Sequence, residues 1–191
     1  MTDPILFALA VLALLATPGP TNTLLMTSGA TTGPASSWRL IPAEIAGYTI
    51  AILAIGYVIG PFIAESWALG MALRVCVALY LAWVAIGLWR HPAAEIDSRR
   101  LIRPRDVFIT TLLNPKALLF GLGIVPLHDP GAFAYMIAFC LMVAAVGASW
   151  ICIGAAIRRG LLPKAGVPLV PRIGAAVITA FAGYLVLAPI L

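Results

Sequence analysis

Six long apolar stretches run through the chain, separated by short segments rich in proline, glycine or charged residues. A helix needs about 20 residues to cross the hydrocarbon core of a bilayer, and each stretch is long enough to do so. A single segment exposed to lipid can satisfy its backbone groups only as an α-helix. The pattern therefore predicts six transmembrane helices, near residues 4–28, 40–63, 68–89, 107–127, 132–157 and 173–191.

The composition excludes several other classes of protein. Apolar residues make up 62% of the 191 residues and charged residues only 10%, whereas roughly a quarter of an average chain is charged. Six spans leave only short loops, so we expect residues 1–191 to form a single transmembrane domain. The net charge of +5 comes from basic residues that flank apolar runs, which does not indicate a nucleic-acid partner. The three cysteines lie inside apolar stretches without a Cys-x-x-Cys motif, which argues against disulfides and a metal site.

Basic residues are distributed unevenly between the loops. Ten of the twelve lysines and arginines lie between spans one and two, three and four, and five and six. Cytoplasmic loops carry an excess of Lys and Arg, so we expect a multi-pass protein of the cell inner membrane with both termini outside. The longest loop, residues 90–106, contains five arginines; a plain solvated loop is the first interpretation and a site for anionic lipid the second.

Proline interrupts the first and fourth stretches well inside their length, in TPGPTN at residues 17–22 and LNPK at residues 113–116. Proline lacks a backbone N–H and disfavours the helical conformation of the residue before it, so each helix must break or kink. Gly19 is expected to relax the first break through its free φ. Breaks persist at membrane depth where they are buried in protein or line a cavity, although simple kinks between packed helices are the alternative.

The two breaks divide the chain into matching halves of three spans, about 1–90 and 107–191, joined by the loop 90–106. Because three is odd, the halves would insert with opposite orientations, and broken helices at corresponding positions of inverted halves indicate a transporter's binding site. The fold class predicted is an all-α membrane protein of six transmembrane helices in two inverted three-helix repeats, with helices one and four broken. The expected substrate-binding residues lie at the breaks: Thr17, Pro18, Gly19, Pro20, Thr21, Asn22, Asn114, Pro115 and Lys116.

The motifs at both breaks resemble those of the LysE/RhtB family of amino-acid exporters. TPGPTNTLL at residues 17–25, followed by small residues up to Gly33, resembles the family's first-span signature, and LNPKA with Phe120 resembles its fourth-span motif. The resemblance covers essentially the whole chain and implies proton-driven export of amino acids. Two positions depart from the family pattern. Thr21 stands where Asn is common, which leaves the amide role to Asn22, and Glu44 stands where a small residue is usual.

Three ionisable residues fall inside predicted spans, namely Glu44, Arg74 and Lys116. A charge at the bilayer centre costs about 2.5–3.5 kcal/mol on insertion scales, so each requires a partner, a cavity or a function. Lys116 could bind a substrate carboxylate or pair with Glu44. Glu44 could carry the proton of an antiporter, or it could pair with Arg39 near the interface. Arg74 is expected to snorkel to the outer surface.

Polar groups at the breaks suit a zwitterionic substrate. The amides of Asn22 and Asn114 both donate and accept hydrogen bonds, and the amino end of the half-helix after Pro20 favours a carboxylate. We therefore expect a secondary exporter of amino acids or close derivatives, coupled to protons and embedded in the lipid bilayer. We expect no cofactor, no bound metal ion and no enzymatic activity.

Other functions remain as alternatives. An exporter of a divalent metal or other small cation should show clusters of His or acidic residues at ligand spacing. An intramembrane enzyme using Ser149 would lack a histidine base within any span. Gly56-x-x-x-Gly60 permits close helix approach, either within one protomer or across a homodimer. Tyr48 and Tyr80 could line a cavity, although packing is the first interpretation.

Overall fold

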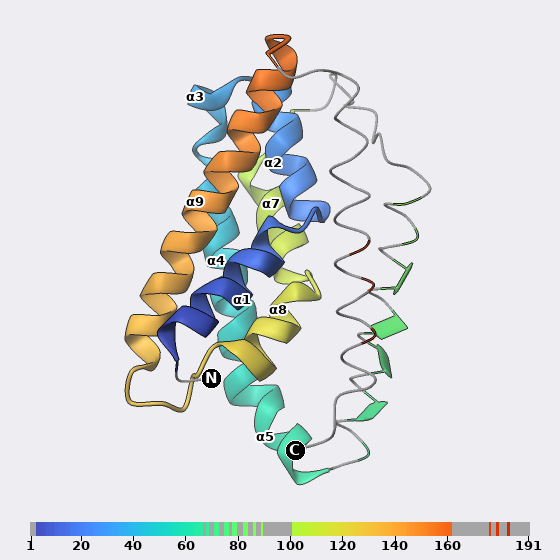
Figure 1. Cartoon of the computed structure of the whole chain (residues 1–191), viewed down its shortest axis with the longest axis vertical. Coiled ribbons are helices and arrows are strands. Elements are labelled where there is room, and N and C mark those ends of the chain that lie inside the picture. Colours follow the sequence, from blue (N-terminus) through green and yellow to red (C-terminus); the bar gives the residue numbers. More distant parts are fainter. Residues whose placement is uncertain are drawn as a thin grey trace.

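A computed structural model of the whole chain describes residues 3–66 and 101–161, together with scattered positions within 68–89 and 176–183. The described chain is helical and contains no strand, as the prediction of an all-α membrane protein requires. The third and sixth predicted spans, Arg74 and residues 91–100 of the basic loop fall largely outside the described residues. The helices that are described include both predicted breaks (Figure 1).

The first predicted span is two helices, α1 (Pro4–Ala16) and α2 (Pro20–Thr31), which meet at an angle of 62°. Asp3 caps α1, because its Oδ1 accepts hydrogen bonds from the backbone N–H groups of Ile5 and Leu6. Proline occupies the first position of each helix, where its missing N–H costs no hydrogen bond. The proline pattern therefore marks a helix start at residue 20, and the predicted break is confirmed.

The second span is continuous and apolar over 29 residues, Pro34–Phe62. It consists of α3 (Pro34–Ser37), α4 (Leu40–Ala54), the π-helix η1 (Ile55–Ile59) and α5 (Gly60–Glu65). A π-helical turn inside an α-helix is rare and frequently occurs at functional sites. The sequence pattern predicted this span but not its π-helical turn.

The fourth span is broken like the first, and the fifth is straight. Helix α7 (Pro104–Leu112) bends by 52° into α8 (Lys116–Leu119), which continues as a second π-helix, η2 (Phe120–Ile124). Helix α9 (Ala132–Arg158) is 27 residues long, enough at 1.5 Å per residue to cross a bilayer with length to spare. Counting each bent pair as one span, the described residues contain up to four spans.

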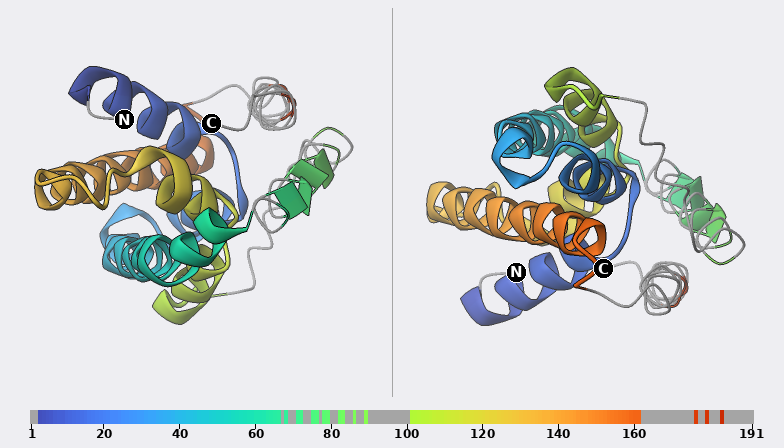
Figure 2. Two further views of the ribbon diagram at one scale, coloured as in Figure 1. Left: turned by 90° about the horizontal axis from the view of Figure 1, so that it is seen from below. Right: turned by 90° about the horizontal axis from the view of Figure 1, so that it is seen from above.

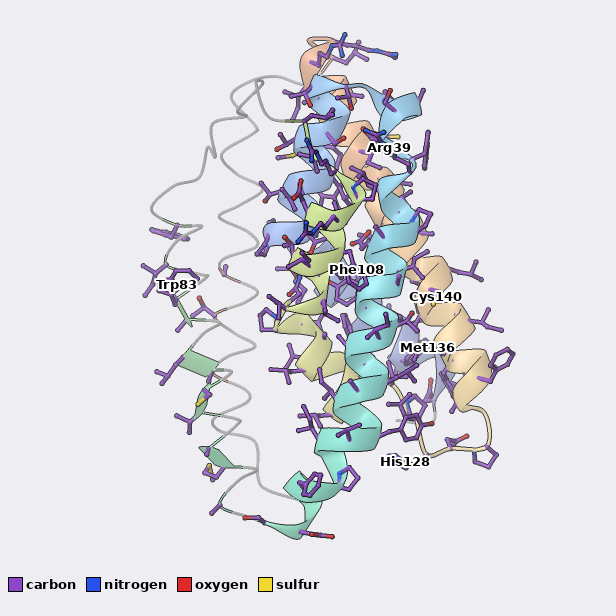
Figure 3. The ribbon with its side chains drawn as sticks, turned by 180° about the vertical axis from the view of Figure 1, so that it is seen from behind. Arg39, Trp83, Phe108, His128, Met136 and Cys140 are labelled. Atoms are coloured by element: carbon purple, nitrogen blue, oxygen red, sulfur yellow. The ribbon has the colours of Figure 1, made fainter. Side chains whose placement is uncertain are left out.

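The two broken helices run in opposite directions. In Figure 1 the chain rises through α1 and α2, descends through α4, descends again through α7 and α8, and rises through α9. Seen end-on, α9 lies between α1 and α4 (Figure 2). Arg39 lies toward one end of the bundle and His128 at the other (Figure 3), and these define the Arg39 end and the His128 end used below. The described arginines all belong to the Arg39 end: Arg39, Arg103, Arg105, Arg158 and Arg159.

Glycines let the helices cross at backbone contact. A Cβ added to Gly154 of α9 would overlap the Met26 carbonyl of α2, and one added to Gly29 would overlap the Ile151 carbonyl. Toward the His128 end, a Cβ on Gly56 of η1 would overlap Leu127 and would lie 3.3 Å from the Gly121 carbonyl of η2. Gly56 therefore lies at a close helix crossing within the protomer.

Candidate functional site

The first break is closed by its own asparagine. Helix α1 ends at Ala16, and Thr17, Pro18 and Gly19 separate it from α2, so carbonyls at the end of α1 lose their helical partners. Buried Asn22 donates from Nδ2 to the carbonyl of Leu15 at 2.8 Å and to the carbonyl of Thr17 at 2.9 Å. Both donors of the amide group are thus used to repair the break from which they come.

The backbone of Gly19 differs from the sequence-based expectation. Its φ of −163° and ψ of 177° are extended, a conformation open to any residue, so the break does not depend on the special freedom of glycine. What distinguishes this position is proximity to Lys116. A Cβ placed on Gly19 would lie 3.4 Å from Lys116 Nζ and cover that face of the ammonium.

The second break is held by contacts with other helices. The Asn114 side chain accepts a hydrogen bond from the Lys116 N–H at 3.0 Å, which fixes the turn into α8. Its Nδ2 lies 3.3 Å from Thr21 Oγ1 of α2 and 3.3 Å from the Tyr48 hydroxyl of α4. One buried amide therefore connects three separate segments of the chain.

Two further contacts join the breaks directly. The hydroxyls of Thr21 and Thr111 lie 3.1 Å apart between α2 and α7. Lys116 Nζ donates to the carbonyl of Thr17 at 2.5 Å, so this carbonyl at the first break accepts from both Asn22 and Lys116. The two breaks, 90 to 99 residues apart in the sequence, thus form one buried polar cluster.

The cluster contains a buried cation, Lys116, for which the described residues 3–66 and 101–161 supply no ion pair. Lys116 is only 6% exposed, and an ammonium has three N–H donors, of which one is used on the Thr17 carbonyl. Gly19, the N-cap of α2, lies against this ammonium, and the first N–H groups of that helix have no partner within the helix. The ammonium and the positive end of α2 both favour an anion at this place.

A buried carboxyl group lies on the same helix face as Tyr48. Glu44 of α4 is 2% exposed, and its Oε2 has no hydrogen-bond partner among the residues that the structure describes. This oxygen faces Gly147 of α9, where an added Cβ would lie 2.6 Å from it. Among the described residues no ion pair links Glu44 to Lys116. The ion pair considered at the sequence level is absent from this conformation.

The structure brings together most of the residues predicted from the two motifs. Pro20 is exposed and Pro115 is partly buried, while the others are buried around the cluster: Thr17, Pro18, Gly19, Thr21, Asn22, Asn114 and Lys116. Sequence reasoning missed Tyr48 and Thr111 as members of the cluster. Tyr48 lies four residues after Glu44 and so shares its helix face, which is a signal that the sequence does carry.

Comparisons with known proteins agree with the membrane character of the chain. No family model matches it, and no solved structure matches it. The chain is similar to a protein of Pseudomonas aeruginosa described as an uncharacterized membrane protein, with 25% identity over 147 residues, covering 71% of this chain and 68% of that protein. Together with its long apolar helices, this similarity identifies the chain as an all-α membrane protein.

Proposed function

We propose that this protein is an inner-membrane secondary transporter that exports amino acids or close derivatives in exchange for protons. The observation that carries the proposal is the buried Lys116 ammonium, which has no ion pair within the described part of the chain and lies at the meeting point of two oppositely directed broken helices. Discontinuous helices with ends directed at the substrate are typical of secondary transporters. The resemblance of both breaks to LysE/RhtB motifs supports the same class.

In this scheme the substrate carboxylate binds Lys116 and the amino end of α2. The carboxylate supplies a negative charge that balances the ammonium. The stronger, charge-assisted hydrogen bond to the carboxylate replaces the hydrogen bond from Lys116 to the Thr17 carbonyl. Gly19 leaves the ammonium uncovered on the side where the substrate would bind. Thr21 and Asn114 supply neighbouring hydrogen-bonding groups for the rest of the molecule.

Glu44 carries the exchanged proton. An unpaired carboxylate buried in protein is costly, and protonation removes that cost. Glu44 also lies one helical turn before Tyr48, whose hydroxyl contacts Asn114 of the cluster. Binding of a carboxylate at Lys116 therefore changes the electrostatic environment of Glu44, which couples substrate to proton.

The arginines support an orientation with the Arg39 end in the cytoplasm. The described arginines gather at that end, whereas Glu65, His128 and Asp129 belong to the opposite end. The positive-inside rule then places the His128 end on the outer side of the inner membrane.

Efflux of preloaded amino acids from proteoliposomes, with and without an imposed proton gradient, tests the proposal. Lys116→Gln is expected to lower efflux at least about tenfold, the loss that a charged hydrogen bond implies, with little change in folded protein. Arg103→Gln, a neutralisation in the exposed loop, is the matched control. Normal efflux by Lys116→Gln would refute the carboxylate site.

Glu44→Gln separates proton coupling from binding. It is expected to abolish uphill efflux driven by a proton gradient while substrate-for-substrate exchange continues, and the exposed Glu65→Gln serves as the control. If Glu44 and Lys116 served only to neutralise each other, each single change would destabilise the protein and the double change would restore both expression and transport. Such a rescue would contradict the roles assigned here.

A further inference from the structure

Three aromatic rings pack together on one side of the polar cluster. Tyr48 of α4, Phe120 of η2 and Phe139 of α9 are fully buried and contact one another edge-to-face, with ring centroids 5.7, 5.8 and 4.9 Å apart. Phe120 follows Asn114 by six residues toward the loop that contains His128. Along its own segment, Phe120 therefore lies between Asn114 and the His128 end of the bundle, and the other two rings pack against it.

We propose that Tyr48, Phe120 and Phe139 form the outer gate of the transport path, and that this conformation has the gate closed. The inference rests on the transport function proposed above, with the His128 end outside. Each ring belongs to a different segment, so a separation of any two segments opens the layer. Edge-to-face contacts make such a layer cohesive without fixing it as strongly as a backbone crossing does.

The segments beside the rings have features of a hinge. Phe120 is the first residue of η2, and η2 packs against the other π-helix, η1, through Gly56 and Gly121. Tyr57 of η1 donates from its hydroxyl to the Leu127 carbonyl at 2.8 Å, which holds the outer loop over this crossing. In a π-helical turn the backbone hydrogen bonds join residues i and i+5, and such turns frequently occur at functional sites. At η1 and η2 these bonds can shift by one residue while the helix stays intact.

Tyr48 connects the gate to the substrate-binding cluster. Its hydroxyl lies 3.3 Å from Asn114 Nδ2, and its ring contacts both phenylalanines. A substrate that accepts a hydrogen bond from Asn114 Nδ2 would replace the Tyr48 hydroxyl as the acceptor. Loss of one hydrogen bond would then loosen the ring nearest the site, which makes Tyr48 the positioning residue of the gate.

Thiol labelling from one side of the membrane tests the gate without any substrate. The reporter is Thr21→Cys, placed in a background in which Cys76, Cys140 and Cys152 are replaced by serine. His128→Cys and Arg159→Cys, each made separately, establish which side a membrane-impermeant maleimide reaches. We expect slow labelling of the Thr21→Cys reporter from the His128 side, because the rings close that path.

Removing ring contacts should open the path. Phe120→Leu and Phe139→Leu keep much of the apolar volume and are expected to raise the labelling rate about tenfold, as the loss of edge-to-face contacts implies. Tyr48→Phe keeps the ring but loses the hydrogen bond to Asn114, so a smaller rise of roughly threefold is expected. The matched control is Phe133→Leu, on the same helix as Phe139 but 79% exposed.

Equal labelling in Phe120→Leu, Phe139→Leu and Phe133→Leu would overturn the gate and leave the rings as core packing. Thermal unfolding of each variant in detergent identifies any that is misfolded. For such a variant, Phe120→Met or Phe139→Met provides a second substitution at the same position. Because labelling requires no substrate, the gate and the amino-acid assignment fail separately. A ring-dependent labelling rate without amino-acid efflux supports the gate and refutes the proposed substrate.

Discussion

The two helix breaks use the same residue types in different ways. At the first break Asn22 lies two residues after Pro20 and turns its amide back onto the carbonyls of Leu15 and Thr17. At the second break Asn114 precedes Pro115 and directs its amide to Thr21 and the Tyr48 hydroxyl on other helices. The Asn22 amide group thus donates within its own break, whereas the Asn114 amide group donates to other helices.

This difference suggests a division of labour between the two broken spans. A break that satisfies its own backbone keeps its shape when neighbouring helices move, so α1 and α2 can act as a fixed wall. A break whose amide bridges to α2 and α4 changes its hydrogen bonds whenever those helices shift. We therefore expect loss of the Asn22 amide to alter mainly stability and loss of the Asn114 amide to alter mainly transport.

The strongest test of the comparison uses the glycines that fix the half-helices after each break. Gly154→Ala would drive a methyl group into the Met26 carbonyl of α2, and backbone cannot yield as a side chain can. We expect a loss of about 3 kcal/mol or more and little folded protein in size-exclusion chromatography. Gly123→Ala is the control, because nothing lies within 4 Å of its added Cβ.

Gly121→Ala is the matching change beside the second break. Its Cβ would lie 3.0 Å from Ile55 Cγ2 and 3.1 Å from the Ile52 carbonyl, a tight contact with less overlap than at Gly154. We expect a smaller destabilisation of about 1–2 kcal/mol, with folded protein retained. If Gly121→Ala were as damaging as Gly154→Ala, the half-helix after the second break would be as fixed as α2.

The asparagines themselves are expected to have smaller effects on stability than Gly154→Ala. Asn22→Ala leaves the Leu15 carbonyl buried without its partner, which should lower the free energy of unfolding by about 2–3 kcal/mol. Asn114→Ala removes longer hydrogen bonds of 3.3 Å and should cost about 1 kcal/mol, while reducing efflux more strongly. Thermal unfolding in detergent and efflux per folded protein measure the two effects. The reverse order of stability would contradict the proposed division of labour.

The sequence was sufficient to locate the breaks but not to assign their side chains. Proline and the apolar pattern identified where spans one and four are interrupted, because a missing N–H acts locally on its own helix. The sequence-based interpretation gave Asn22 and Asn114 the same role, because the partners of Asn114 depend on how distant helices pack. The π-helices η1 and η2 and the place of Tyr48 in the cluster were missed for the same reason.

The smallest effect on stability is expected at Gly19, where the sequence suggested a conformational role. Its extended backbone accepts alanine, and the added methyl would make ordinary contact with Lys116 Nζ at 3.4 Å, so the free energy of unfolding should change by less than about 0.5 kcal/mol. The methyl would nevertheless cover the ammonium, so Gly19→Ala should raise the KM for efflux. Gly19→Ala made in the Lys116→Gln background should have little further effect on the KM for efflux. Both substitutions act on the same contact, so their effects are not additive. Full additivity in this double-mutant cycle would mean that Gly19 acts on the first break alone, and the Lys116 face beside it would not be the substrate's binding surface.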